Sequence, residues 1–377
     1  MELRRVGLAL RRGVRTAAGT HGLRPVMYVR VVTDQTEGWG ECGALLGGTA
    51  ADPSVDLVYE SLVGGGVARL LTAAAARHGA VPEAVEVARL YNTDAVGKMS
   101  AAAIEMAVLD AELRSAGTPL ATRLGAALRP VAVGAVAGIP AGHRLGALVD
   151  AVDALVDQGY ARVRLKIEPG WDFWPVKSVR ERHPSLALQA DANGGYQMGA
   201  DGEDGAERLV ALDPFELACI EQPLAPSDLP GHAELAKRLE TPICLDESLT
   251  SLRRLADAIR SGACAVACLK PARLGGLFAA RRAEIMCVEA GVPAFVGGFF
   301  ESGLARSANA SLAARGGFSL AGDLSDPGGY LVCDPCGYPE VRGGSVIPSA
   351  EPGVGPHPSA AAIEDLTEGC SWFSALG

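Results

Sequence analysis

The stretch from residue 242 to residue 276 reads PICLDESLTSLRRLADAIRSGACAVACLKPARLGG, and it decides how the chain folds. Two short apolar runs, at 242–247 and 265–270, flank a segment whose apolar residues have helical spacing. A strand, a helix and a second strand in this order form a unit in which the two strands are parallel. Each run closes on a charged residue, Asp246 in the first and Lys270 in the second.

The same alternation repeats across the middle of the chain. Apolar runs short enough for buried strands recur there, and segments with helical periodicity lie between them. The expected strands are 131–139, 162–168, 186–191, 217–223, 242–247, 265–270, 293–298 and 318–323. The expected helices are 143–158, 172–182, 203–212, 231–239, 251–261, 277–290 and 301–314. Eight parallel strands that alternate with helices close into a barrel, so the predicted fold class is α/β with a (β/α)8-type, TIM-like barrel.

Residues 1–127 have a different pattern of apolar and polar residues, which predicts an α+β unit. The first part reads as strands joined by turns. The Ala- and Leu-rich part that follows reads as helices, with the clearest one over 100–117. The tail over 324–377 is rich in Gly and Pro, and we expect it to return to the N-terminal unit. The barrel is therefore expected over 128–323.

The composition limits the partners that this chain can have. The 377 residues carry a net charge of −10 and the pI is near 5.2, so neither nucleic acid nor an anionic membrane surface is expected as a partner. No apolar run approaches the length of a membrane-spanning helix. The Arg-rich start fits a first strand better than a transit peptide. The nine cysteines lack the paired spacing of a zinc site, and free thiols in a reducing cytoplasm fit best.

Three acidic residues end three consecutive predicted strands. They are Asp191 in QAD, Glu221 in CIEQP and Asp246 in CLDE. In a barrel of this kind the carboxyl ends of the strands meet at one rim, where the chemistry lies. Three converging carboxylates would repel one another and raise each other's pKa unless a cation lies between them. Oxygen ligands suit a hard divalent ion, so we expect Mg²⁺, with Mn²⁺ as the alternative.

Two lysines flank the acidic trio. Lys166 ends the second predicted strand and Lys270 the sixth, one barrel position outside the acids on either side. A metal ion with an amine on each side favours removal of the proton next to a substrate carboxylate, through an enediolate. Arg162 and Arg164 share one strand face with Lys166, and repulsion from Arg164 would keep Lys166 partly neutral near pH 7. A solvated edge strand is the alternative interpretation of this basic run.

The ordered set of motifs resembles the enolase superfamily, in its muconate-lactonizing-enzyme subgroup. It is most similar to the N-acylamino acid racemase and o-succinylbenzoate synthase family. The resemblance covers nearly the whole chain, and the stretches that carry it are LKIEPGWD, DAN, IEQPL, TPICLDES and LKPARLGG, with AAIEMAVLDAEL and GHAEL in support.

This resemblance implies a two-part architecture and a complete set of site residues. The N-terminal region 1–127 and the tail 324–377 would form a capping domain over the barrel mouth, and the loop RTAAGTHGL, residues 15–23, would close over the substrate. The implied metal ligands are the acidic trio, Asp191, Glu221 and Asp246. Lys166 and Lys270 would be the acid and base on opposite faces of the substrate.

Several positions depart from the family pattern. The usual Lys-x-Lys of the second strand is here Arg164-x-Lys166, and Arg cannot shuttle protons because it stays charged. The expected Pro-Gly-Arg after the strand-six lysine is Pro-Ala-Arg, ending in Arg273. The segment GGFFESGL is bulkier than expected at Phe299 and Phe300. GDLSD lacks the Asp-x-Asp that dipeptide epimerases use, and no His–Asp dyad supports a mandelate-racemase-type mechanism.

Five residues are candidates for substrate binding, each with a second interpretation. Arg164 either holds a carboxylate and perturbs Lys166 or only stabilises the barrel. Asn193 equally fits a local turn, and Arg273 equally fits a surface ion pair. Glu301 and Ser302 equally fit the start of the helix after the seventh strand.

The expected activity is metal-dependent racemisation of N-acylamino acids, N-succinylamino acids in particular. The alternatives are o-succinylbenzoate synthase, a muconate-type cycloisomerase, and a catalytically silent binding protein of the same fold. The expected partner is a small-molecule carboxylate substrate, and a homo-oligomer is expected because closed assemblies are common.

Overall fold

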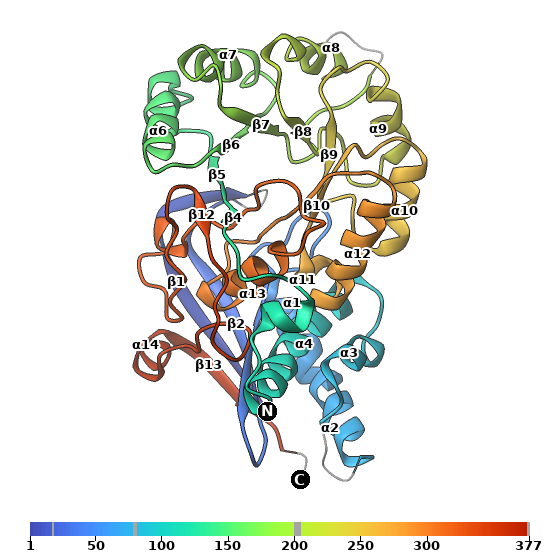
Figure 1. Ribbon diagram of the computed structural model, residues 1–377, viewed down its shortest axis with the longest axis vertical. Helices are drawn as coiled ribbons and strands as arrows, with labels where there is room; N and C mark the ends of the chain where they lie inside the picture. Colours follow the sequence, from blue (N-terminus) through green and yellow to red (C-terminus); the bar gives the residue numbers. More distant parts are fainter. Residues whose placement is uncertain (17–18, 78–80, 200–204, 375–377) are drawn as a thin grey trace.

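The computed structural model describes the chain except residues 17–18, 78–80, 200–204 and 375–377. Two parts are visible in Figure 1: a parallel sheet ringed by helices, and an antiparallel sheet with its own helices beneath it. Among the described residues, no helix combines the length and the apolar character that crossing a membrane requires.

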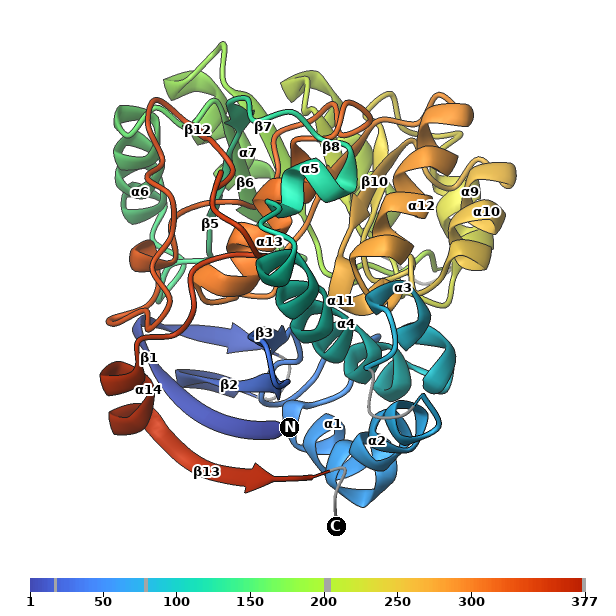
Figure 2. The ribbon, with the colours of Figure 1, turned by 60° about the horizontal axis from the view of Figure 1, so that its bottom comes forward.

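The parallel sheet has seven strands in the order β11-β10-β9-β8-β7-β6-β5, and it curls into a barrel. The helices of each βα unit cover its outer face (Figure 2). The strands are β5 (Gly134–Ala137), β6 (Arg162–Lys166), β7 (Ala187–Asp191), β8 (Cys219–Glu221), β9 (Ile243–Leu245), β10 (Val266–Leu269) and β11 (Ala294–Val296). The helices are α6 (Leu145–Asp157), α7 (Phe173–Arg182), α8 (Gly205–Val210), α9 (Leu229–Leu235), α10 (Leu252–Arg260), α11 (Pro271–Leu274), α12 (Leu277–Glu289) and α13 (Gly303–Ala313).

The eighth predicted strand, 318–323, is not a strand. It still closes the ring, because Leu320 N donates to Ala294 O on β11 at 3.3 Å and Gly322 N donates to Ala132 O on the other side at 3.1 Å. Asp323 N donates the next bond to β11, to Val296 O. Between these two bonds the segment advances by three residues while β11 advances by two. A regular parallel ladder advances equally on both strands. This slip prevents a continuous ladder although the ring is closed.

The antiparallel sheet has the order β13-β1-β2-β3. It combines β1 (Glu2–Thr16), β2 (Gly19–Val32) and β3 (Glu37–Cys42) with β13 (Thr367–Trp372) from the far end of the sequence. The long helix α4 (Ala95–Ser115) packs on β3, where a Cβ atom at Gly38 or Gly40 would collide with its backbone. The remaining helices of this part are α1 (Val55–Ser61), α2 (Val67–Ala75), α3 (Ala84–Val87) and α5 (Leu120–Leu124), with short π and 3₁₀ turns at Leu62–Gly66 and Ala88–Leu90.

The tail after the barrel contributes little regular structure. It contains β12 (Ser345–Val346), which pairs with β4 (Val131–Ala132), then α14 (Ala360–Leu366) and β13. Further 3₁₀ turns lie at Asp213–Phe215 and Pro327–Gly329. Pairing of β13 with β1 places the tail against the N-terminal part, and the domain bounds 1–127, 128–323 and 324–377 stay a prediction.

Buried charged side chains of the N-terminal part join it to the barrel. Glu105 on α4 accepts from Leu277 N at the start of α12 at 2.5 Å. Glu41 on β3 accepts from Ser302 N at the start of α13 at 2.9 Å. Because the first turn of a helix has N–H groups without partners inside the helix, a carboxylate there is favourable. Two helices of the barrel are thus capped by the other part of the molecule.

Candidate active site

The charged candidates lie side by side because the strands that carry them are neighbours in register. Lys166 on β6 pairs with Asp191 on β7, and Asp191 pairs with Glu221 on β8. Asp246 directly follows β9, and Lys270 directly follows β10. Since parallel neighbours end at the same edge, these side chains gather at the carboxyl rim of the barrel.

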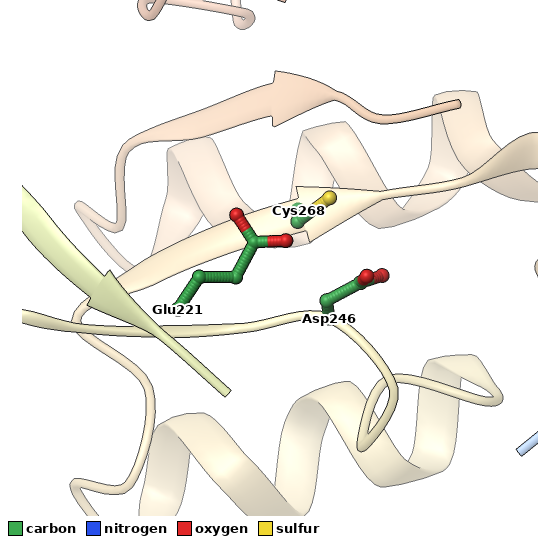
Figure 3. A group of neighbouring side chains, drawn as sticks. All are labelled: Glu221, Asp246 and Cys268. Atoms are coloured by element: carbon green, nitrogen blue, oxygen red, sulfur yellow. The ribbon is translucent and has the colours of Figure 1, made fainter. Parts of the chain in front are cut away.

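Two carboxylates of the predicted metal site converge, and a thiol joins them. Glu221, Asp246 and Cys268 each offer a ligand atom, and these atoms lie within 4.8 Å of one another (Figure 3). Asp191 lies outside this group, because its Oδ2 accepts from Lys166 Nζ at 2.6 Å and lies 3.6 Å from Arg164 Nε. The structure therefore brings Glu221 and Asp246 together and holds Asp191 beside them through cationic side chains.

The surroundings of Glu221 fit a divalent cation. Burial raises the pKa of Glu221 to about 8, Arg164 opposes this rise, and three nearby carboxylates add to it, those of Asp191, Asp246 and Asp323. A bound cation would relieve this repulsion. Close by, Oε2 of Glu247 is buried without a hydrogen-bond partner in the part of the chain that the structure describes. A donor set made mainly of carboxylates suits a hard divalent ion.

Lys166 lies at the rim in contact with two neighbours. Its Nζ donates to Asp191 Oδ2 and to Asn193 Oδ1, each at 2.6 Å. Asn193 has φ of 43°, in the left-handed region that Asn tolerates, and its Nδ2 donates to Glu247 at 2.9 Å. Asn193 is thus both a turn residue and a partner of Lys166.

Lys270 is more enclosed than Lys166, with 11% of its side chain exposed against 28%. Its Nζ donates to Asp246 Oδ2 at 2.7 Å and lies 4.6 Å from the centre of the Phe299 ring. Burial acts to lower the pKa of Lys270, but the carboxylate of Asp246 acts in the opposite direction, and the pKa lies above its ordinary value. Lys270 is therefore an ammonium covered by an aromatic ring.

Arg164 points to protein carboxylates. Its Nη1 donates to both oxygens of Glu221, at 2.9 and 2.6 Å, and its Nη2 donates to Asp323 Oδ2 at 2.7 Å. Only 7% of the side chain is exposed. The sequence predicted that Arg164 holds the substrate carboxylate or acts on Lys166, and that role stays a prediction beside these contacts.

Arg273 links the two parts of the molecule at the site. Its Nε and Nη2 donate to the carboxylate of Asp52, at 2.8 and 2.7 Å, and its Nη1 donates to Asp246 O at 2.9 Å and to the Asp246 carboxylate. Asp52 lies just before α1, in the N-terminal part. Arg273 therefore binds Asp246, a candidate metal ligand. The predicted contact of Arg273 with the substrate stays a prediction.

Glu301 and Ser302 are engaged inside the protein, at the start of α13. Glu301 accepts from Phe299 N at 2.8 Å and pairs with Arg306 at 2.9 Å. The Ser302 hydroxyl donates to Glu41 at 2.7 Å. These contacts agree with the second interpretation, in which the two residues begin a helix. They do not support the predicted role of Glu301 and Ser302 in substrate binding.

The loop before α13 is held by the N-terminal part. Arg24 on β2 is buried, and its Nε donates to the carbonyls of Phe299 and Phe300, each at 3.3 Å. Phe300 has φ of 57°, a conformation that is costly for a bulky residue and must be imposed by its surroundings. Arg24 follows the predicted substrate loop 15–23, of which residues 17–18 lie outside the described residues.

Sequence reasoning missed Asp323 as a site residue. It closes the eighth apolar run, and its carboxylate accepts from Arg164 at 2.7 Å and from Arg162 at 2.9 Å. Burial acts to raise the pKa of Asp323, but Arg164 and Arg162 lower it to about 2. The signal was available, because a charged residue at the end of an apolar run had identified the candidates on the second to the sixth predicted strands.

Cys268 was also missed at the sequence level. It precedes Lys270 by two positions, so both side chains lie on the inner face of β10. Burial raises the pKa of Cys268 above its ordinary value, and the carboxylates of Asp246 and Glu221 add to the rise. Alternation along the strand was the only sequence signal for its position.

Family models match both parts of the chain. A model described as the mandelate racemase / muconate lactonizing enzyme N-terminal domain matches residues 2–125, and one described as enolase C-terminal domain-like matches residues 147–362. The N-succinylamino acid racemase of Amycolatopsis sp is 39% identical and covers 100% of this chain and 99% of its own length. The o-succinylbenzoate synthase of Geobacillus kaustophilus is 35% identical, with 98% and 96% covered.

Solved structures agree with this comparison. An enolase superfamily member from Listeria innocua superposes with a TM-score of 0.90 at 29% identity, over 98% of this chain and 97% of that one. The muconate lactonizing enzyme from Pseudomonas fluorescens, solved with muconolactone, has a TM-score of 0.81 at 22% identity, over 98% of both chains, which is a likeness of fold alone.

Proposed function

The chain is an enzyme of the enolase superfamily, in the mandelate racemase and muconate lactonizing enzyme family, and we propose that it racemises N-acylamino acids, N-succinylamino acids in particular. One observation carries the proposal. Lys166 on β6 and Lys270, which directly follows β10, stand at the two ends of the row of strands that bears the candidate metal ligands. Two amines on opposite sides of one carbon allow a proton to leave from one face and return to the other.

We propose that Glu221 and Asp246, with Asp191 as a third ligand, hold a divalent cation, Mg²⁺ ahead of Mn²⁺. When bound, the cation would neutralise the negative charge that develops on the substrate carboxylate as the proton leaves. The protein's own part is to keep the ligands in place. Arg164 fixes the Glu221 carboxylate and Arg273 fixes that of Asp246.

The two lysines differ in their surroundings, and this difference assigns their starting states. Lys270 is held as an ammonium by Asp246 and covered by Phe299, so it suits donation of a proton. Lys166 also donates to a carboxylate, that of Asp191, but its side chain is more exposed and can exchange its proton with solvent, so it suits acceptance after that proton has left. The opposite enantiomer requires the opposite starting states. Phe299 also excludes water from the Lys270 side.

A second candidate is o-succinylbenzoate synthase. The relative from Geobacillus kaustophilus, which carries that name, covers 98% of this chain at 35% identity. A syn dehydration begins with the same proton removal, but a single lysine serves as base and then as acid. The substrate in both cases is a small carboxylate. The expected homo-oligomer also stays a prediction.

The test is an exchange assay on the full chain with Mg²⁺ in D₂O. N-succinyl- and N-acetylamino acids of both configurations are followed by proton NMR for loss of the α-proton signal, and by chiral chromatography for inversion. The precursor of o-succinylbenzoate is assayed in parallel. We expect exchange with inversion for an N-succinylamino acid. Rapid conversion of the precursor without any exchange or inversion of N-acylamino acids would assign the enzyme to the second candidate.

A further inference from the structure

A thiol lies among the carboxylates of the active site and has no task in the proposed reaction. Cys268 Sγ is within 4.8 Å of a ligand oxygen of Glu221 and of Asp246. Figure 3 shows the three side chains as neighbours. The residue is 1% exposed. Gly297, which directly follows the neighbouring strand β11, makes room for the sulfur, because a Cβ atom there would collide with Sγ. The thiol therefore occupies a defined place beside the two oxygens.

The other cysteines of the barrel do not share this position. Cys219 and Cys244 lie with Val266 and Phe295 in an apolar cluster, and neither belongs to the group of converging ligand atoms in the described chain. Cys264 is buried, but its thiol donates to Val266 O at 3.2 Å. Cys268 belongs to the same apolar cluster and also faces the carboxylates. It is the thiol that can reach an ion there.

We propose that Glu221, Asp246 and Cys268 form a site for thiophilic divalent cations such as Zn²⁺, Cd²⁺ and Co²⁺, as a second binding mode of the active site. Zinc binds sulfur at about 2.3 Å and carboxylate oxygen at about 2.1 Å, so donors in a tetrahedral site lie ~3.5 Å apart. The three ligand atoms lie within 4.8 Å of one another, so they must move closer together to bind one ion. The thiol proton is released to solvent when the sulfur binds.

This binding mode differs from the binding of Mg²⁺ through three carboxylates in its third ligand, which is Cys268 instead of Asp191. A hard cation such as Mg²⁺ takes oxygen and gains nothing from sulfur, so it uses Asp191. A soft cation gains a thiolate and can leave Asp191 with Lys166. The two kinds of ion then compete for Glu221 and Asp246. The inference shares the metal site with the proposed function but needs none of its chemistry.

The test uses Co²⁺ and Cd²⁺ on the chelator-treated full chain. With Co²⁺, the wild type should show a thiolate-to-cobalt charge-transfer band in the near ultraviolet, and Cys268→Ser should lose it. Cys264→Ser, which removes a buried thiol outside the group, should keep it. Calorimetry should show that Cys268→Ser weakens Cd²⁺ binding by at least about tenfold and Mg²⁺ binding far less, because only the soft ion gains from a thiolate ligand.

A measurement on the wild type protects the test against a variant that fails to fold. X-ray absorption of the Zn²⁺-loaded protein should show one sulfur neighbour at about 2.3 Å. Zinc with oxygen and nitrogen neighbours only would overturn the proposal, and so would a charge-transfer band that survives in Cys268→Ala. If Cd²⁺ binds through sulfur but Mg²⁺ does not bind, the proposed function fails while this inference stands.

Discussion

The guanidinium of Arg164 lies against the carboxylate of Glu221, with Nη1 2.9 Å from Oε1 and 2.6 Å from Oε2. A residue that departs from the usual Lys-x-Lys pattern is thereby tied to a candidate metal ligand. The same guanidinium reaches Asp323 at the point where the barrel closes. Its charge is thus shared by two buried acids.

Replacing Arg164 with Met should therefore destabilise the protein, because two buried carboxylates lose a charged partner, although Asp323 keeps Arg162 and Glu221 keeps the amide of Gln189. We expect a loss of about 3–5 kcal/mol in the free energy of unfolding, measured by urea denaturation. Arg164→Lys should lose less, since a charge remains but fewer hydrogen bonds can form. A fully stable Arg164→Met protein would show that Glu221 and Asp323 find other partners.

The two lysines should act on opposite faces of the substrate. Lys166→Ala and Lys270→Ala should each abolish racemisation, and each should still exchange the α-proton of one enantiomer through the lysine that remains. The measurement is proton NMR in D₂O on each enantiomer of an N-succinylamino acid. Wild-type exchange rates for both enantiomers in both variants would contradict the two-base mechanism.

Removal of the divalent ion should stop turnover. After exhaustive chelation we expect activity to be lost and to return on addition of Mg²⁺ or Mn²⁺. Glu221→Gln should weaken Mg²⁺ binding measured by calorimetry, with Glu181→Gln, whose side chain is 64% exposed, as the control. Full activity after chelation would exclude the metal-assisted reaction.

Glu105 should make stability depend on pH. Burial raises its pKa to about 8, against an ordinary value of 4.5, although the N–H groups of Leu277 and Phe278 oppose the rise. Because the folded-state pKa is the higher one, its stabilising contribution is complete below pH 4.5 and is lost as the pH rises towards 8. Glu105→Gln keeps the Oε1 acceptor and removes the titration.

The free energy of unfolding of Glu105→Gln minus that of the wild type, measured by urea denaturation, should accordingly increase between about pH 5 and pH 8, with a slope of at most about 1.4 kcal/mol per pH unit. Glu181→Gln provides the exposed control. A difference that does not change with pH would mean that the carboxylate is already ionised in the folded protein at pH 5.

Arg24 should control the loop that carries Phe299. Arg24→Met removes the donors to the carbonyls of Phe299 and Phe300 and leaves a buried acceptor at Phe299 and a partly buried one at Phe300. We expect a loss of at least about 1–3 kcal/mol in unfolding free energy, together with a lower kcat/KM. Arg253→Met, at a side chain that is 91% exposed, is the control and should change neither quantity. Normal kinetics in a folded Arg24→Met enzyme would contradict the coupling.

The parts of the site that the sequence predicted are those with a local signature. Asp191, Glu221 and Asp246 each end an apolar run, and a parallel barrel brings such ends together whatever the details of packing. The α/β barrel itself followed from the same alternation. The partners of Arg164 could not be predicted from this alternation, because its contacts with Glu221 and Asp323 span 57 and 159 positions of the sequence.

The eighth strand and the thiol show two further limits. The run 318–323 has a strand-like composition, but the slip against β11 depends on how the ring closes, which no local pattern encodes. Cys268 looks like an ordinary apolar residue of β10 until Glu221 and Asp246 are seen beside it. Long-range geometry, not residue type, decides both cases.

The pairing of β13 with β1 has a consequence for synthesis. Arg4 Nη1 and Thr367 Oγ1, which lie 3.4 Å apart across these strands, are separated by 363 positions of the sequence. A ribosome that adds about 5–20 residues per second needs on the order of 20–70 s to cover that span. During this interval β1 is an open sheet edge, the kind of surface that invites pairing with another chain. The barrel strands β5 to β11 precede β13 in the sequence, so β13 is the last strand of the antiparallel sheet to be synthesised.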